Sequence, residues 1–186
     1  MRPALELANT TYADQGGLRD ALETPADLAA WLGRVDHLLA VRVDARSRAA
    51  VGRKELAAAR DLRAAIRAVA SAAASGQAPD PAQLERLNAA VRAAPRWQEL
   101  DVHDGAPRLT SRHGAAAVTG ALAEVAADAV VLFAEGRVGV CGAPGCVLLF
   151  LRDRPNREWC SNACGNRARV ARHHDRHKQA RPTPAA

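Results

Sequence analysis

Aromatic residues and long apolar runs are both scarce in this chain of 186 residues. Only six residues are Phe, Trp or Tyr, and much of the remaining apolar content is alanine, which favours helices over strands. No segment supplies the roughly 18 uninterrupted apolar residues of a membrane span, since the best candidate, 115–134, contains Glu124 and Asp128. The chain also lacks an apolar N-terminal run. We therefore expect an α-rich cytoplasmic protein with no membrane partner.

Cysteine is absent from the first three quarters of the chain. The four cysteines follow the pattern C-x4-C-x13-C-x3-C and are Cys141, Cys146, Cys160 and Cys164. Two close pairs of thiolates suit tetrahedral Zn²⁺, whose sulfur ligands lie about 2.3 Å from the metal. A reducing cytoplasm favours metal binding, with a disulfide or free thiols as the alternative. Four thiolates leave no open coordination position, so we predict one structural zinc ion.

Enzyme signatures are missing as well. No nucleophile has a recognisable base, no glycine loop is suited to cradling phosphate, and no helix face carries paired carboxylates. The pair His103-Asp104 lies in a predicted turn. The polar segment Asn9-Thr10-Thr11-Tyr12 is explained equally well by helix N-capping or by the lining of a pocket. We therefore expect a protein that is not an enzyme.

The first 136 residues carry no net positive charge. They hold 16 Lys and Arg against 17 Asp and Glu, whereas residues 137–186 hold 10 against 3, so the net charges are −1 and +7. A zinc ion bound by four thiolates adds about −2 to the second segment. The basic excess therefore belongs to the cysteine-containing segment.

Helical patterns dominate residues 1–136. Capping signals at Thr24-Pro25 and Asp80-Pro81 precede apolar stripes, and further helices are predicted over 46–74 and 114–135. The composition and these patterns predict a mostly α fold with a small β component (α+β).

A β-hairpin is predicted within 97–111, where loosely alternating residues flank Asp104-Gly105. We divide the chain into a helical N-terminal domain (1–136), a small zinc finger (137–178) and a disordered tail (179–186). The two domains are expected to adjoin through the last helix of the first domain.

The cysteine-containing segment predicts a treble-clef-like zinc finger. A strand is expected to lead into Cys141, a second strand-like run covers 147–151, and a short return strand is expected at 158–160. A helix follows, with the second cysteine pair in its first turn. Phe150 and Trp159 are expected in the core of the finger.

Three arginines share one face of this predicted helix. Arg169, Arg172 and Arg176 are spaced i, i+3 and i+7, and Val170 and His174 lie on the other side, where they can face the hairpin. Such a stripe suits DNA phosphates. The alternative is a solvated or protein-facing surface.

Two motifs in the finger, Trp159-Cys160-Ser161 and Cys164-Gly165-Asn166-Arg167, resemble the CGNR zinc finger, a family named for that tetrapeptide. Leu149-Phe150-Leu151 and the polar turn after it are similar to the segment between that family's cysteine pairs. The upstream region is similar to the helical domain that accompanies this finger in stress-induced transcription regulators. That similarity rests on four segments: 7–10, 28–32, 62–67 and 87–88. The likeness covers nearly the whole chain.

The resemblance implies that the four cysteines are the zinc ligands and that Gly165, Asn166 and Arg167 complete the signature. We expect Gly165 to let the chain pass close to the last thiolate. Asn166 is expected to satisfy backbone groups at the helix start, and Arg167 to brace the hairpin or reach a phosphate. The chain departs from the family pattern at Glu158, where a basic residue is usual, and at Val147, where glycine is frequent.

We therefore interpret the chain as a zinc-binding bacterial transcription regulator with a role in the stress response. Its finger is predicted to contact DNA through Arg167, Arg169, Arg172 and Arg176. One finger makes few phosphate contacts, so residues 1–136 are expected to supply homodimerisation, sensing of a small-molecule effector, or both. The alternative is a zinc-stabilised protein- or RNA-interaction module without sequence-specific DNA binding.

Overall fold

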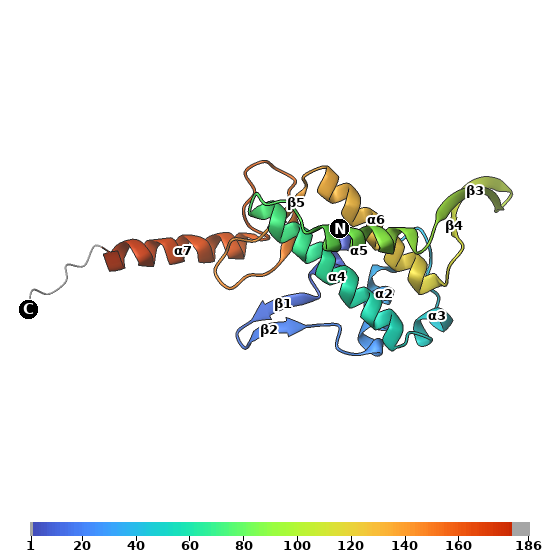
Figure 1. Ribbon diagram of the computed structural model, residues 1–186, viewed down its shortest axis with the longest axis horizontal. Coiled ribbons are helices and arrows are strands. Elements are labelled where there is room, and N and C mark those ends of the chain that lie inside the picture. The colour runs from blue at the N-terminus through green and yellow to red at the C-terminus, as the bar shows by residue number, and fades with distance from the viewer. Residues whose placement is uncertain (1, 180–186) are drawn as a thin grey trace, which may run out of the picture.

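The computed structural model of the protein describes residues 2–179. Within this range the helices are α1 (Pro3–Ala8), α2 (Pro25–Val35), the 3₁₀ turn η1 (Asp36–Leu38), α3 (Ala45–Ala49), α4 (Arg53–Ala74), α5 (Pro81–Arg92), α6 (Ala117–Ala134) and α7 (Asn162–Gln179). The strands are β1 (Thr11–Asp14), β2 (Gly17–Asp20), β3 (Arg96–His103), β4 (Ala106–His113), β5 (Val138–Val140) and β6 (Leu149–Leu151). They form three separate antiparallel pairs, β1–β2, β3–β4 and β5–β6 (Figure 1). The predicted α+β class is confirmed.

Helix α6 forms the centre of the hydrophobic core, with nine of its residues buried. Its two acidic side chains accept hydrogen bonds from backbone N–H groups of other segments. Glu124 accepts hydrogen bonds from the backbone N–H groups of Ala40 and Val41, and Asp128 accepts one from Ala4. By length and composition α6 could cross a membrane, but its packing against other helices identifies it as a core helix.

Side-chain caps explain where two of the predicted helices begin. Before α2, Thr24 and Asp27 form a reciprocal capping box, in which the Asp27 carboxylate accepts from the Thr24 N–H at 2.7 Å. Before α5, the Asp80 carboxylate accepts from the Ala82 N–H at 2.9 Å. Each of these two helices has proline at its first position, where no backbone donor is lost, as predicted.

The predicted helix over 46–74 is wrong in one respect, because it is broken at residues 50–52. Gly52 is the N-cap of α4, and its N–H donates to the Glu55 carboxylate at 2.9 Å. This local cap satisfies a free backbone donor and therefore separates α3 from α4. The following long apolar helix starts at Ala117, three residues later than predicted.

The hairpin β1–β2 was not anticipated from the sequence. Its strands are four residues long and largely exposed, so they carry little apolar alternation. The buried side chain of Arg63 on α4 ties the hairpin to the core: it donates to the Asp20 carboxylate at 2.5 and 2.7 Å and to the Thr10 hydroxyl at 2.9 Å. Asn9 and Thr10 end α1 rather than cap the start of a helix.

The hairpin β3–β4 is confirmed and is longer than predicted. Its strands pair from His103–Ala106 at the turn to Arg96–His113 at the base. Asp104 and Gly105 both have positive φ, 52° and 74°, as a two-residue type I′ turn requires. The hairpin extends away from the helices, and no residue of either strand is buried (Figure 1).

The zinc-finger segment begins with β5 and β6, which pair with each other across the first two cysteines. The predicted return strand at 158–160 is wrong, since these residues form no strand. The junction between the two parts of the chain is also broader than predicted. Gly136 leads from α6 directly into β5, but β5 packs against α4 and β6 against α1.

Helix α7 begins at Asn162 and points away from the rest of the protein (Figure 1). Its first two turns belong to the finger, where Cys164, Gly165 and Ala168 are buried. The predicted tail over 179–186 lies outside the described residues, apart from Gln179, which ends α7.

Candidate metal centre

Two short segments bring the four cysteines together. Cys141 and Cys146 lie at the ends of the turn that joins β5 to β6, where Gly145 adopts a positive φ of 71° and lets the chain reverse. Cys160 precedes α7, and Cys164 lies in its first turn. The Ser161 hydroxyl caps this helix by accepting from the Cys164 N–H at 3.2 Å, which fixes the position of the last ligand.

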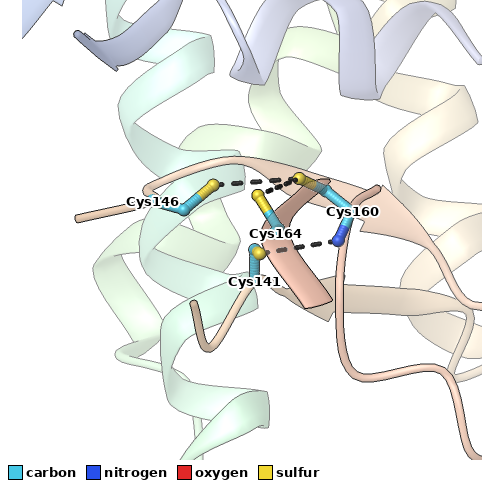
Figure 2. Close-up of side chains that lie close together, drawn as sticks. All are labelled: Cys141, Cys146, Cys160 and Cys164. Atoms are coloured by element: carbon cyan, nitrogen blue, oxygen red, sulfur yellow. Dashed lines mark hydrogen bonds between the residues drawn. The ribbon is translucent and has the colours of Figure 1, made fainter. Parts of the chain in front are cut away.

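The four sulfur atoms lie within 4.8 Å of one another (Figure 2). The distance from Cys160 Sγ is 3.8 Å to Cys146 Sγ and 3.4 Å to Cys164 Sγ. A tetrahedron with metal–sulfur bonds of about 2.3 Å has sulfur–sulfur edges of about 3.8 Å. The donor set and its size therefore fit one Zn²⁺, and the cysteines are free rather than disulfide-bonded. The predicted zinc site is confirmed.

Protons compete with the metal for these thiols. Burial raises the pKa of Cys160 and Cys146, because an ionised sulfur in the interior loses its hydration. Burial also opposes the ionisation of Cys164, but hydrogen bonds with Ser161 and the neighbouring thiols outweigh it and lower the pKa of Cys164 to about 7. Zinc binding must therefore displace protons, and zinc affinity rises with pH.

Two donors from outside the thiol set reach the sulfur atoms. The Cys160 backbone N–H donates to Cys141 Sγ at 3.5 Å, and the Arg167 guanidinium donates to Cys164 Sγ at 3.2 Å. Both offset negative charge that the thiolates carry once they bind the metal. From the sequence, Arg167 was expected either to brace the hairpin or to contact a phosphate. In the structure it lies against the cysteine cluster.

The finger contains two aromatic side chains, each held between a glycine and an arginine. Phe150 packs over Gly139, and the Arg157 guanidinium lies 5.2 Å from its ring centroid. Trp159 packs against Gly165, and a Cβ on that glycine would lie only 2.9 Å from the indole. Gly165 therefore makes room for the Trp159 ring. The sequence had suggested instead that this glycine lets the chain pass close to the last thiolate.

Arg172 covers the other side of the Trp159 ring, with its guanidinium carbon 5.6 Å from the ring centroid. Arg157 also donates to the carbonyls of Leu151, Trp159 and Cys160. These bonds hold together the two ends of the loop that connects β6 to α7. These contacts build a small core beside the metal, with Phe150 buried and Trp159 half-buried. Both aromatic residues were predicted to lie there.

Two polar side chains from the helical part fix the finger in place, and sequence reasoning missed their role. The Asn9 side chain accepts from the Leu149 N–H at 2.8 Å and donates to the Leu149 carbonyl at 2.9 Å. The Arg67 guanidinium donates to the Val147 carbonyl at 3.0 Å and to the Ala8 carbonyl at 3.1 Å. We call Asn9 and Arg67 the bracket. Both residues fall within segments on which the family resemblance rests, and that was the available signal.

The arginine stripe keeps its spacing but differs from the prediction in its surroundings. Arg169 and Arg176 are exposed, and Arg169 donates to the Asn166 side chain. Asn166 is the fifth residue of α7, so it lies in the second turn and does not cap the start of the helix. Val170, expected to face the hairpin, is 56% exposed, because Ala168 occupies the side of α7 that packs on the finger.

Two family models match the chain. Residues 1–136 match the family described as "Putative stress-induced transcription regulator", and residues 137–177 match the CGNR zinc finger. The first match covers more than half of the chain, and both agree with the resemblance seen in the sequence. No curated protein matches the chain.

Proposed function

The chain belongs to the family described as a stress-induced transcription regulator, with a CGNR zinc finger at its end, and we propose that it binds duplex DNA through α7. The observation that carries this proposal is the placement of α7. Its first two turns are fixed on the finger beside the cysteine cluster, while the helix beyond them extends away from the rest of the protein (Figure 1). Zinc acts here as a cross-link that holds the base of the helix. A helix presented in this way can enter a groove without deforming the protein.

The charge of α7 supports a phosphate-bearing partner. Residues 162–179 contain five Lys and Arg and one acidic residue, Asp175. Arg169 and Arg176 are exposed on one face of the helix and are the contacts that we propose. Arg172 shares this face but also covers Trp159, and Arg167 donates to the Cys164 sulfur, so both contribute mainly to the finger itself.

The test is a titration of mixed genomic duplex fragments with the zinc-loaded full-length protein, followed by fluorescence anisotropy over a series of salt concentrations. We expect log affinity to fall steeply with log salt. The double variant Arg169→Glu, Arg176→Glu is expected to lower affinity by at least about tenfold and to reduce the salt slope by about two. The zinc content of this variant is expected to stay unchanged, since neither side chain touches the cysteines.

A matched control reverses two exposed arginines of the helical part, Arg53→Glu and Arg86→Glu, with the same change in net charge. Unaltered binding by this control would show that α7, and not overall charge, attracts the DNA. Equal losses in both double variants would contradict the proposal. A flat salt response of the wild type would favour the alternative of a zinc-stabilised protein- or RNA-interaction module.

We further propose that the helical part responds to a small-molecule effector. A cavity of about 570 Å³ lies between α5, α6 and the base of β3–β4, and its lining includes Val91, Arg96, His113 and Ala123. This volume lies within the range of small-molecule sites. Isothermal titration with candidate metabolites, compared between the wild type and Ala123→Trp, tests whether the cavity is occupied, because the larger side chain would fill it.

A further inference from the structure

The hairpin β3–β4 exposes more apolar surface than an isolated ribbon should. Leu100, Val102 and Leu109 are 76%, 67% and 65% exposed, and Trp97 is 47% exposed. Neither strand joins a third strand in the described part of the chain. A two-stranded ribbon is at best marginally stable in water, and its stability generally requires packing against something else.

The pairing register places Leu100, Val102 and Leu109 on one face, together with Pro107, and Trp97 on the other. Leu100 lies opposite Leu109, and Val102 lies opposite Pro107, and residues two apart along a strand share a face. We call these four residues the apolar face of the hairpin. Such a continuous patch on a protein surface usually marks an interaction site.

The opposite face is already satisfied within the hairpin. Arg112 pairs with Glu99 at 3.3 Å and with Asp101 at 3.2 Å, and the Trp97 indole N–H donates to Glu99 at 2.6 Å. The charged side chains therefore compensate one another on one side of the ribbon. Only the apolar face is left without a counterpart.

We infer that the apolar face of β3–β4 is a homodimer interface, on which the hairpin of a second copy of this chain packs. Residues 96–113 contain three arginines and three acidic residues, so the ribbon has no net charge to attract nucleic acid or an anionic membrane surface. The apolar face is self-complementary, because leucine lies against leucine at its centre and an isologous contact presents the same residues from both sides. Two copies of this apolar face can therefore pack on each other without a charged or polar partner group.

The size of the contact sets its expected strength. Strands of eight residues are about 27 Å long, and a two-stranded ribbon with its side chains is about 10 Å wide. Two ribbons in contact along their full length, with Gln98 and Ser111 continuing the apolar face toward the base, bury at most on the order of 1,000 Å² in total, near the lower limit for a specific interface. We therefore expect a weak, reversible dimer that forms at micromolar or higher concentration.

The hairpin and α7 lie at opposite ends of the molecule's long axis (Figure 1). Dimerisation through β3–β4 therefore leaves both zinc fingers uncovered. The inference stands independently of DNA binding, since it rests only on the exposure, register and charge of residues 96–113.

Sedimentation velocity of the zinc-loaded full-length protein, from about 1 to about 300 μM and without DNA, tests the inference. We expect the wild type to pass from monomer to dimer over this range. Leu100→Arg places a charge at the centre of the apolar face and is expected to weaken the dimer at least about tenfold. The control Thr110→Arg adds the same charge to the opposite face of the same hairpin and is expected to leave the dimer intact.

Far-ultraviolet circular dichroism and zinc content should be the same in all three proteins, because Leu100 is exposed and Thr110 is only half-buried on a ribbon of which no residue is buried. A wild type that stays monomeric at the highest concentration would overturn the inference and leave a different protein as the occupant of the face. A Leu100→Arg variant that dimerises like the wild type would overturn it as well.

Discussion

Two antiparallel hairpins in this protein differ in almost everything except their pairing. β3–β4 has eight-residue strands and a favourable type I′ turn, yet none of its residues is buried. β5–β6 has strands of only three residues, yet Leu149 is 4% exposed and belongs to the main hydrophobic core. The longer ribbon therefore has more internal pairing, and the shorter one has more tertiary support.

The difference shows what holds a ribbon in place. β5–β6 is fixed by the bracket, Asn9 and Arg67, by packing on α1 and α4, and by the metal centre at its turn. β3–β4 relies on its turn and on cross-strand pairs, which contribute only about 0.2–1 kcal/mol each. We therefore expect the shorter hairpin to be the more stable one as long as zinc is bound.

Removal of zinc is expected to have the largest effect on the difference in stability between the two hairpins. Structural zinc contributes an apparent binding free energy of about 10–16 kcal/mol in finger modules, so a chelator is expected to unfold the metal-bound turn and the first turn of α7. Hydrogen exchange measured by mass spectrometry should show lost protection over 138–165 and unchanged protection in α4 and α6. Retained protection over 138–165 would contradict a structural role for the metal.

The affinity of the site for zinc has a defined pH dependence. The folded, metal-free cluster holds protons on Cys146 and Cys160, whose pKa values burial raises, so zinc must displace them. Zinc affinity is therefore expected to fall as pH falls, and to fall more steeply below about pH 7, where Cys164 also becomes protonated. Competition with a chromophoric chelator at pH 8 and pH 6 measures this change.

Truncating one leucine in each hairpin gives a smaller and more direct contrast. Leu149→Ala leaves a cavity in the core and is expected to lower the free energy of unfolding by about 2–5 kcal/mol. Leu100→Ala removes an exposed side chain and is expected to change it by less than about 0.5 kcal/mol. Urea unfolding of the zinc-loaded monomer at low concentration measures both. Equal costs would contradict the difference in burial.

Loss of the bracket should have a smaller effect than removal of zinc or of the Leu149 side chain. Asn9→Ala removes two hydrogen bonds and leaves the Leu149 N–H and carbonyl partly buried without partners, at an expected cost of about 1–3 kcal/mol. Faster amide exchange at Leu149 in NMR spectra would report the local loss. Gln98→Ala, which removes an exposed amide from β3, is the control, and a similar effect at Leu149 in that variant would argue against the bracket.

The features that the sequence predicted are local ones. Capping residues and proline mark the starts of α2 and α5, a two-residue turn marks β3–β4, and cysteine spacing marks the metal centre. Each of these signals acts over a few neighbouring residues or through a known ligand geometry, so no knowledge of packing is required. The break at Gly52 was missed because a long alanine-rich pattern masked its cap.

The contacts that the sequence did not predict join distant segments. Asn9 meets Leu149 across 140 positions, and Arg67 meets Val147 across 80. A polar residue at the end of α1 gives no local sign of its partner, and the roles of Arg167 and Gly165 depended on where the Cys164 sulfur and the Trp159 ring lie. These roles are set by the tertiary structure.

The sequence by itself determined that this protein is mostly helical, that it holds zinc through four cysteines, and to which family it belongs. These properties depend on periodicity, capping and ligand spacing, which a chain carries before it folds. Only the tertiary structure decided that the finger is fixed to the helical core, that α7 extends free of it, and that β3–β4 presents an apolar face. Burial and hydrogen-bond partners are set by which surfaces meet, and in this protein those surfaces come from opposite ends of the chain.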